Sequence, residues 1–522
     1  TEKRRRRKRG TLPPAPRVPI INPAVCEGCG DCSVASNCLS VEPVETDLGP
    51  KRRINLSTCN SDLSCLDGFC PSFVTVAGAA RRKPAPDARP DLDAALASLP
   101  LPDLPARSVW DLLVTGVGGT GVVTVGQIAA MAAHLEGRGV SVLDFTGFAQ
   151  KFGPVLSYLR IAARPADLTQ VRIDAASADA LIGCDIVVSS SPKASACLSP
   201  ATRAVVNLAE MPTGDIVLDR DASLRVPDRV AALSGAVGQL GTLDAGRLAE
   251  GLLGDTVFAN MMMLGFAWQS GLVPVGLDAL HRAIDLNAVA VAANRRAFAL
   301  GRLAAADPAV FAEKPAPVES ADALVERRAA ALTAYQNAAL ATRFRNALTP
   351  VLGDADLTRA AANSLFKLMA YKDEYEVARL HRDPAFAARI ARDFGPDARL
   401  TYHLAPPLLP GRDGRGRPRK RRFPGWAMGP AFALLSRMKG LRGTVLDPFG
   451  HTAERRMERD LIPWFEGVIG QAATLARSDR RNDALRVLQA PMGMRGFGPV
   501  KRAAVERVQV EVAALLRDQT QV

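Results

Sequence analysis

The sequence predicts a multidomain protein of the α/β plus α class, and three observations carry this prediction. Seven of the nine cysteines fall between residues 26 and 70. A strand, a glycine-rich turn and a helix follow one another from Val109, and strands and helices alternate from there. Helical patterns dominate beyond residue 306. The chain of 522 residues is too long for one core, and 48% hydrophobic with 23% charged residues indicates a folded protein.

Changes in composition predict the domain boundaries. We expect a basic tail at 1–20, a cysteine-rich domain at 21–78, a Pro- and Ala-rich linker at 79–108, an α/β domain at 109–305 and a helix-rich carboxyl-terminal domain at 306–522. In the α/β domain the apolar segments 109–116, 140–147, 155–162, 184–190 and 204–210 are the expected strands. Helical segments lie between them, which predicts a mainly parallel sheet.

Seven cysteines form two runs that share one spacing, with three ligand positions separated by two residues each and a more distant fourth. The first is Cys26-x2-Cys29-x2-Cys32-x5-Cys38, and the second is Cys59-x2-Asp62-x2-Cys65-x4-Cys70-Pro71. In bacterial ferredoxins, a run of this kind gives three ligands to one iron–sulfur cluster and its fourth cysteine to the other cluster. This spacing predicts a ferredoxin-like domain with two clusters. The expected ligands are Cys26, Cys29, Cys32 and Cys70 for the first cluster, and Cys59, Asp62, Cys65 and Cys38 for the second.

Asp62 stands where a thiol is expected. A carboxylate is a harder ligand for iron than a thiolate. The second cluster is therefore either [4Fe-4S] with one Asp-ligated, labile iron or [3Fe-4S]. The alternative for Asp62 is an ordinary surface turn residue, and the alternative for the whole group is structural zinc. Cys184 and Cys197 lie among apolar or small residues and are interpreted as core or near-surface thiols.

A glycine loop follows the first expected strand of the α/β domain. Gly116, Gly118 and Gly121 form G-x-G-x-x-G between a strand and a helix, which predicts a Rossmann-like domain that receives a phosphate at the helix N-terminus. Asp144, near the end of the next expected strand, has the place of a ribose-binding acid. Lys151 lies in a polar loop after that strand and is a candidate phosphate contact. The alternatives are glycines needed only for packing and a solvent-facing lysine.

The net charge of +13 is concentrated in two basic blocks, residues 3–9 and 411–422. Such blocks bind nucleic acid or an acidic protein, or form solvated loops. Aromatic residues do not interleave them, so a stacking platform for bases is poorly supported. No apolar run approaches the roughly 20 residues of a membrane span, and no secretory signal opens the chain. We therefore expect a cytoplasmic protein, in which clustered cysteines bind metal rather than form disulfides.

Four segments together resemble one family. They are "CEGCGDCSVASNCLSVEP" (26–43), "KRRINLSTCNSDLSCLDGFCPSF" (51–73), "GVGGTGVVTVGQIAAMAAHLEG" (116–137) and "KLMAYKDEYEVARL" (367–380). In this order they are similar to the carboxyl-terminal half of the fused indolepyruvate ferredoxin oxidoreductases, which belong to the thiamine-dependent 2-oxoacid:ferredoxin oxidoreductases. The resemblance identifies residues 109–305 with the gamma domain of that family. It implies that Gly118, Gly119 and Lys151, with Gly116 and Gly121 of the same loop, contact coenzyme A or another subunit.

The resemblance also implies a reaction. An aryl-pyruvate and coenzyme A are converted to an acyl-CoA and carbon dioxide, and two electrons leave through iron–sulfur clusters to ferredoxin. The Gly-Asp-Gly motif and the following Asn that bind thiamine diphosphate and Mg²⁺ in the family do not occur here. We therefore expect the thiamine half on a partner subunit or on a longer polypeptide, a dimer of the complete unit, and no decarboxylation by this chain alone. The catalytic residues are not indicated. Two alternatives remain, namely an NAD(P)-linked iron–sulfur reductase and a basic iron–sulfur protein that binds nucleic acid.

Overall fold

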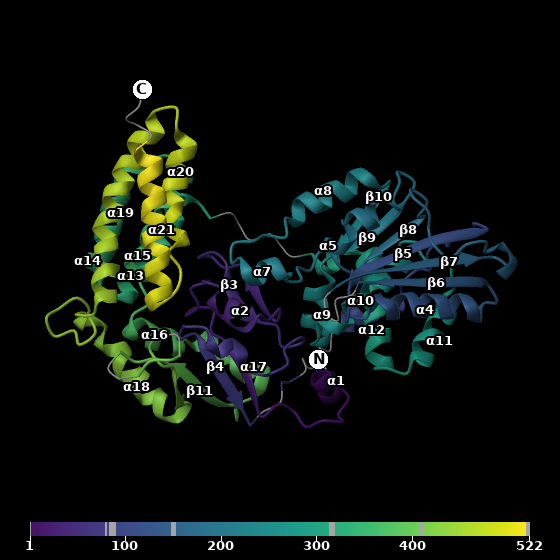
Figure 1. Ribbon diagram of the computed structural model, residues 1–522, viewed down its shortest axis with the longest axis horizontal. Coiled ribbons are helices and arrows are strands. Elements are labelled where there is room, and N and C mark those ends of the chain that lie inside the picture. Colours follow the sequence, from purple (N-terminus) through teal and green to yellow (C-terminus); the bar gives the residue numbers. More distant parts are fainter. Residues whose placement is uncertain are drawn as a thin grey trace. The chain divides into compact units, whose positions relative to one another are not determined.

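The computed structural model describes residues 2–78, 81–82, 90–147, 153–312, 319–407, 409, 411–414 and 416–517. The chain forms two compact units (Figure 1). Unit 1 comprises Thr1–Arg82, Gly214–Arg220 and Ala316–Val522, and unit 2 comprises Lys83–Thr213 and Asp221–Pro315. The cysteine region and the carboxyl-terminal region thus belong to the same unit.

The sheet of unit 1 is built from both ends of the chain. Its order is β1-β4-β11-β12, and every neighbouring pair is antiparallel. Strands β1 (Arg17–Ile21) and β4 (Phe73–Ala77) flank the cysteine region, whereas β11 (Arg399–Leu404) and β12 (Arg421–Pro424) come from the carboxyl-terminal region. Between β1 and β4 lie α2 (Asp31–Ser36), the hairpin β2 (Val41–Val44) and β3 (Lys51–Ile54), and the short helix η1 (Ser64–Asp67).

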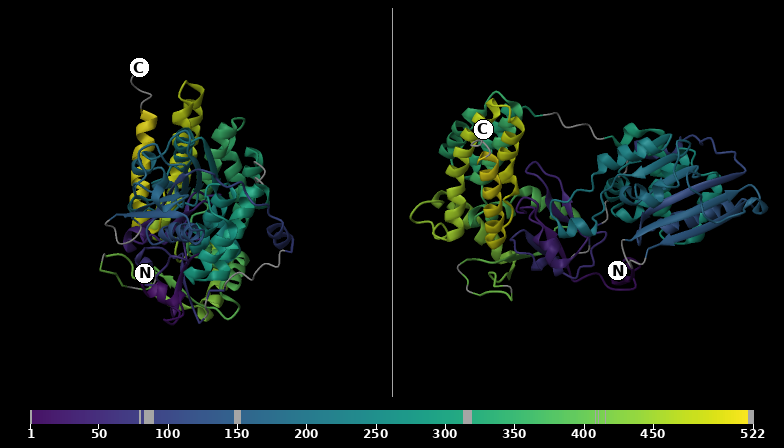
Figure 2. Two further views of the ribbon diagram at one scale, coloured as in Figure 1. Left: turned by 90° about the vertical axis from the view of Figure 1, so that its right-hand side faces the viewer. Right: turned by 45° about the horizontal axis from the view of Figure 1, so that its top comes forward.

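The other elements of unit 1 are mostly helices. They are α1 (Glu2–Lys8), α7 (Gly214–Leu218), α13 (Ala321–Tyr335), α14 (Ala338–Leu348), α15 (Ala355–Met369), α16 (Glu374–His381), α17 (Pro384–Phe394), α18 (Gly425–Arg437), α19 (Ala453–Arg477), α20 (Arg481–Gln489) and α21 (Gly498–Arg517). Helices α13, α14, α15, α19, α20 and α21 stand side by side as a bundle (Figures 1 and 2). The bundle core includes Phe344, Leu365 and Phe465, which are almost fully buried, because these helices turn their apolar faces inward.

Unit 2 is a sheet covered by helices on both faces. The strand order is β10-β9-β8-β5-β7-β6. The strands are β5 (Val109–Val117), β6 (Gly139–Thr146), β7 (Pro154–Ala162), β8 (Ala180–Gly183), β9 (Arg203–Asn207) and β10 (Gln239–Leu243). Strands β10, β9, β8 and β5 are parallel, whereas β7 is antiparallel to both β5 and β6.

Alternate residues of β5 face the two helical layers of unit 2. Leu112 and Val114 belong to one core cluster and Leu113 belongs to another. The first layer holds α4 (Val122–Leu135), α9 (Ala245–Leu253), α10 (Ala259–Gln269), α11 (Leu277–Asn287) and α12 (Val291–Ala306), and α3 (Pro90–Ala97) also packs on this side. The second layer holds α5 (Ile186–Ser189), α6 (Pro192–Ser195) and α8 (Val226–Ala236).

The structure confirms the fold class expected from the sequence and corrects its details. The sheet is mixed, with β6 and β7 as an antiparallel extension of the parallel part. The expected strand at 184–190 is wrong, because Asp185 caps a helix there by accepting a hydrogen bond from the N–H of Val188. The strand at this place in the sheet is β8, just before it. Among the described residues, no helix is long and apolar enough to cross a membrane.

Candidate iron–sulfur centres

The first cysteine loop turns at two glycines. Gly28 and Gly30 have φ angles of +67° and +76°, in the left-handed region that glycine enters without strain. This path carries Cys26 and Cys29 around one side of a hollow and begins α2 just before Cys32. The Gly28 N–H donates a hydrogen bond to Cys26 Sγ at 3.3 Å. A backbone donor aimed at a thiolate favours its charged form, which is the form that binds iron.

The second cysteine loop follows the same path without glycine. Ser61 and Leu63 occupy the positions equivalent to Gly28 and Gly30, and their φ angles are +57° and +68°. The Ser61 N–H donates to Cys59 Sγ, again at 3.3 Å. Left-handed backbone costs a non-glycine residue about 1–2 kcal/mol, so the surrounding structure must hold this conformation. The match places Asp62 where the first loop has Cys29.

The first set of thiols surrounds one hollow. Cys26, Cys29, Cys32 and Cys70 line it together with the loop backbone, Arg52 and Phe69. Burial, followed by the nearby Cys70, raises the pKa of the Cys29 thiol to about 12. The same two causes raise the pKa of Cys26 and Cys32 above the ordinary value. These thiols are therefore neutral unless a metal displaces their protons.

The second set gathers Cys38, Cys59 and Cys65 with Asp62. Burial and the neighbouring groups of this set raise the pKa of Cys65, and burial with Cys38 and Asp62 raises that of Cys59. Cys38, Cys59 and Cys70 also pack against one small apolar core formed around Cys26, Cys32 and Cys65. The chain thus brings the fourth cysteine of each run toward the three ligand positions of the other run.

The Asp62 side chain is exposed and has a local role. Its Oδ1 accepts hydrogen bonds from the Ser64 N–H at 3.1 Å and from the Ser64 hydroxyl at 2.8 Å, at the start of η1. Within the described part of the chain, no hydrogen bond to its Oδ2 occurs. The geometry therefore accommodates both interpretations of Asp62, as a turn residue and as a ligand through Oδ2.

The first donor set is of the kind that holds a cluster, because four cysteine thiolates are the usual ligands of [4Fe-4S]. In the portion of the chain that the structure describes, no three His, Cys, Asp or Glu side chains converge closely enough to hold one metal ion. A tetrahedral zinc ion, with Zn–S bonds of about 2.3 Å, requires such convergence. A cubane instead attaches each thiolate to a different iron. Cys26, Cys29, Cys32 and Cys70 line one hollow.

Positive side chains from both basic blocks lie on the cysteine loops. Lys420 Nζ donates to the carbonyls of Leu66 and Gly68 at 2.9 and 2.7 Å, and Arg417 donates to the carbonyl of Asp67 at 2.9 Å. From α1, Arg4 and Arg7 donate to the carbonyls of Thr58 and Asn60 at 2.6 and 2.8 Å. The blocks are thus partly structured against the cysteine region. Sequence reasoning missed Arg417 and Lys420 because nothing local links residue 420 to residue 68.

Helix α16 and the segment before it fasten the cysteine region from another side. Lys372 Nζ forms an ion pair with Glu27 Oε1 at 2.5 Å and donates to the carbonyl of Cys26 at 3.1 Å. His381 is buried, with Nε2 3.0 Å from the carbonyl of Pro71. Burial lowers the pKa of His381 to about 4, so its ring is neutral near pH 7. These contacts explain part of the motif at 367–380, which sequence analysis left without a role.

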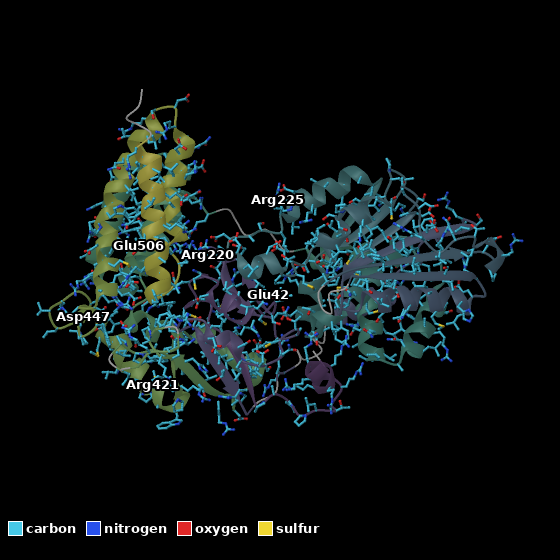
Figure 3. All side chains as sticks on the ribbon, viewed as in Figure 1. Glu42, Arg220, Arg225, Arg421, Asp447 and Glu506 are labelled. Carbon is cyan, nitrogen blue, oxygen red and sulfur yellow. The ribbon has the colours of Figure 1, made fainter. Side chains whose placement is uncertain are left out.

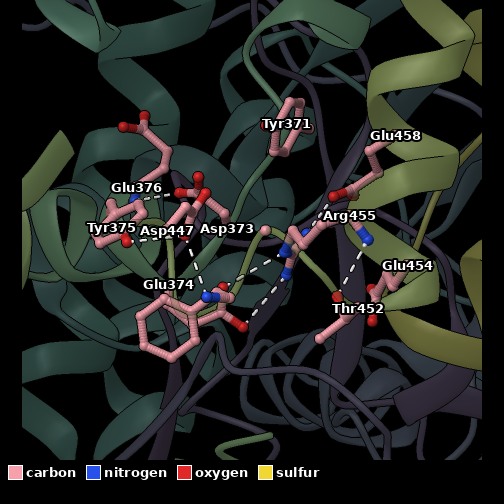
Figure 4. Close-up of polar contacts among 12 residues, drawn as sticks. Tyr371, Asp373, Glu374, Tyr375, Glu376, Asp447, Thr452, Glu454, Arg455 and Glu458 are labelled. Carbon is pink, nitrogen blue, oxygen red and sulfur yellow. Dashed lines mark hydrogen bonds and ion pairs between the residues drawn. The ribbon is translucent and has the colours of Figure 1, made fainter. Parts of the chain in front are cut away.

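Buried polar contacts also fix the same segment to the loop that precedes α19. Arg442 and Asp373 form a two-bond ion pair with distances of 2.5 and 2.9 Å, and each side chain is only 3% exposed. The Tyr375 hydroxyl donates to Asp447 Oδ1 at 2.9 Å (Figure 4). Such pairs are costly to break singly, because the remaining charge stays buried.

Residues 214–220 complete unit 1 beside the first cysteine loop. Arg52 donates to the carbonyl of Arg220 at 3.1 Å, and Arg220 donates to the carbonyl of Gly493 at 3.1 Å. Figure 3 labels Arg220 and Glu42, the latter on hairpin strand β2, where it pairs with Arg53 at 2.6 Å. The hairpin and residues 214–220 therefore both pack beside the cysteine region.

The glycine loop of unit 2 combines packing with an open turn. A Cβ on Gly116 would lie 2.6 Å from Val122 Cγ2, so this position requires glycine for strand–helix packing, and the Gly118 N–H donates to the carbonyl of Gly153 at 2.7 Å. Gly119 and Gly121 have φ angles of +85° and +102°. No side chain caps α4, because its N-cap is Gly121.

The wider surroundings of this loop differ from a dinucleotide site. Asn260 Nδ2 donates to the carbonyl of Thr120 at 3.1 Å, a contact that sequence reasoning missed. Asp144 lies on the edge strand β6, with β7 between it and β5, so it is not on the strand adjacent to the glycine loop. Lys151 lies outside the described residues. The carboxylate that follows the adjacent parallel strand β8 is Asp185, which is buried and accepts the Val188 N–H at the start of α5.

Comparison with known families divides the chain into two matched regions. Residues 111–304 match the model of the pyruvate ferredoxin/flavodoxin oxidoreductase family, and residues 321–514 match a family of unknown function (DUF6537). The chain thus contains a domain similar to the pyruvate ferredoxin/flavodoxin oxidoreductase family, followed by a domain similar to a family of unknown function. No curated protein matches the chain.

Several solved structures are similar to part of the chain. A pyruvate oxidoreductase subunit from Thermotoga maritima is 20% identical over 38% of this chain and 96% of its own, with a TM-score of 0.28. The gamma subunit of a keto/oxoacid ferredoxin oxidoreductase from Geobacter sulfurreducens is 19% identical over 38% and 98%, with a TM-score of 0.27. The 2-oxoglutarate:ferredoxin oxidoreductase from Magnetococcus marinus is 18% identical over 42% and 36%, with a TM-score of 0.30.

Proposed function

We propose that this chain is the electron-transfer and gamma portion of an indolepyruvate, or other aryl-pyruvate, ferredoxin oxidoreductase. The complete enzyme would oxidise and decarboxylate a 2-oxoacid to an acyl-CoA in the cytoplasm and pass the electrons to ferredoxin. Thiamine diphosphate and Mg²⁺ would be bound by a partner half, and the working enzyme would be a dimer of the complete unit that contains both halves.

The observation that carries this proposal is the matched geometry of the two cysteine loops. They share left-handed positions two and four residues after their first cysteine, and they share a backbone N–H to sulfur bond of 3.3 Å. This repetition supports two clusters with exchanged fourth ligands, namely Cys26, Cys29, Cys32 and Cys70 for one and Cys59, Asp62, Cys65 and Cys38 for the other. The match of residues 111–304 to the oxidoreductase family gives the two clusters their context.

Bound clusters would accept and release single electrons at the low potentials available to thiolate-ligated iron, which extend to about −700 mV. The chain's own residues supply the rest. The Gly28 and Ser61 N–H groups donate to ligand sulfurs. Positive side chains on the loops would stabilise an electron accepted by a bound cluster. These side chains are Arg4, Arg7, Arg417 and Lys420. The loop Gly116, Gly118, Gly119 and Gly121, with Lys151, is proposed as the contact for coenzyme A or a subunit.

The second candidate is an NAD(P)-linked iron–sulfur reductase, and the geometry of unit 2 disfavours it. The strand that carries Asp144 is not adjacent to β5. A nucleic-acid-binding role is disfavoured because Arg4, Arg7, Arg417 and Lys420 are directed to backbone carbonyls of the chain itself.

The proposal is tested on anaerobically purified protein. We expect about seven or eight iron atoms and about eight sulfides per chain, as one [3Fe-4S] with one [4Fe-4S] cluster or two [4Fe-4S] clusters require. Zinc in place of iron would contradict the cluster assignment. Addition of the thiamine-binding half should restore dye reduction that depends on aryl-pyruvate and coenzyme A. Failure with every 2-oxoacid tested, despite intact clusters, would refute the assigned reaction.

A further inference from the structure

Unit 1 contains a second hollow, which is lined by lysines and lies beside the first cysteine loop. Four lysines and two glutamates face it, namely Lys51, Lys367, Lys372, Lys501, Glu27 and Glu458. The lysines come from β3, α15, the segment before α16, and α21. The hollow has a volume of about 30 Å³, which exceeds the roughly 10–15 Å³ that one water requires.

Two of these lysines are neutralised by the glutamates. Lys372 Nζ lies 2.5 Å from Glu27 Oε1, and Lys501 Nζ lies 2.5 Å from Glu458 Oε1. Glu458 is also shared with Arg455, which in turn contacts Glu374 (Figure 4). Each carboxylate of the hollow thus already has a cation in direct contact, and within the described part of the chain neither Lys51 nor Lys367 forms an ion pair with one of them.

The two remaining lysines differ in their contacts. Lys367 Nζ donates to the carbonyls of Pro491 and Met492 at 3.0 and 2.8 Å, which are neutral acceptors. Lys51 is only 6% exposed, and within the described part of the chain its Nζ has no hydrogen-bond or ion-pair partner. An ammonium group with three donors is rarely buried in this state. Burial lowers the pKa of both groups, so each ammonium is poorly stabilised as it stands.

We infer that this hollow is a binding site for a compact dianionic oxyanion, such as hydrogen phosphate or sulfate, with Lys51 and Lys367 as its counter-charges. A dianion matches the two unneutralised ammonium groups. The volume admits a group of a few atoms and excludes a nucleotide. Lysine binds phosphate-type groups as a point charge without requiring a planar arrangement. The inference concerns a site outside the glycine loop and does not depend on the proposed reaction.

The test measures binding of inorganic phosphate to the full chain, purified without oxygen in a phosphate-free and sulfate-free buffer. Isothermal titration should give one site per chain, with sulfate as a competitor and chloride as a much weaker one. Lys51→Met should weaken phosphate binding at least tenfold. Lys51→Arg, which keeps the charge, should retain most of it. Lys3→Met removes the same charge from an exposed position on α1 and serves as the matched control.

Thermal unfolding tests the same site by a second method, the shift of the Tm on addition of phosphate. Phosphate should raise the Tm of the unsubstituted protein and of the Lys3→Met control. Lys51→Met should raise the Tm in the absence of phosphate, because it removes an unpaired buried charge, and should abolish the response to phosphate.

The outcomes separate the possibilities. Saturable binding lost in Lys51→Met supports the site. Competition by coenzyme A but not by its 3′-dephospho form would identify the phosphate as one carried on a larger ligand, and no competition by coenzyme A would identify the free ion. Absence of saturable phosphate or sulfate binding, or equal binding by Lys51→Met, would overturn the inference. Each result can be obtained whether or not the protein turns over an aryl-pyruvate.

Discussion

Gly68 provides a direct test of the first proposed cluster. It follows η1 with φ −62° and ψ 138°, a conformation that alanine adopts freely. A Cβ at this position would nevertheless lie 2.6 Å from Cys32 Cα and 2.7 Å from Cys32 Cβ. Gly68→Ala therefore acts on Cys32 by steric contact alone, without backbone strain.

The size of the effect follows from these distances. Ordinary carbon contacts begin at 3.4 Å, so Cys32 and residue 68 must separate by about 0.8 Å. Metal ligands tolerate deviations of only about 0.2 Å. Overpacking of this kind costs about 1–3 kcal/mol, which a folded unit survives. The variant should therefore fold and lose the first cluster, so that iron and sulfide fall by about half.

The measurements are iron and sulfide content and the electron paramagnetic resonance spectrum of the reduced protein. Signals of the second cluster should remain. The control is Gly467→Ala on α19 of the same unit, where a Cβ meets nothing within 4 Å; it should leave iron unchanged and add about 0.5–1 kcal/mol of stability. Full iron content and an unchanged spectrum in Gly68→Ala would refute the placement of Cys32 as a ligand.

Three further predictions use the same protein. Lys420→Met should lower the reduction potential of at least one cluster by on the order of tens of millivolts, because the ammonium held at the carbonyls of Leu66 and Gly68 favours the added electron; redox titration followed by electron paramagnetic resonance measures this, and an unshifted potential contradicts it. Asp373→Asn should lower the free energy of unfolding by about 3–5 kcal/mol, because Arg442 remains buried without its partner; denaturant titration measures this, and a loss below 1 kcal/mol would exclude an essential ion pair. Asp62→Cys should convert any [3Fe-4S] signal to [4Fe-4S], and an identical spectrum removes Asp62 from the ligand set.

The cysteine loops were largely predictable because their determinants are local. Ligands at every third residue require a tight wrap, and Gly28 and Gly30 permit it. The second loop was harder, because Ser61 and Leu63 give no sign in the sequence of their left-handed backbone. Only the alignment of the two runs by their cysteines indicated that Asp62 takes the place of Cys29.

The sequence did not predict all of the strands or how they pair in the sheet. The apolar run at 184–190 was interpreted as a strand, but Asp185 caps a helix there and the short strand β8 precedes it. A run of this length is ambiguous between helix and strand. The antiparallel pairing of β6 with β7 does have a local signal, because β6 ends at residue 146 and β7 begins at residue 154, too short a connection for the crossover that parallel neighbours need. The insertion of β7 between β6 and β5 has no such signal.

The region that matches the family of unknown function is an integral part of the cysteine region rather than a separate attachment to it. Strand β11 pairs along β4, which lies directly after the last cysteine of the second run. Residues 372, 381, 417 and 420 all contact backbone within or next to the cysteine loops. Removal of residues 399–424 would leave β4 with an unpaired edge and would leave the carbonyls of Leu66 and Gly68 without their Lys420 donor. The two regions should therefore unfold together. The carboxyl-terminal region positions the cysteine loops and places positive charge beside them.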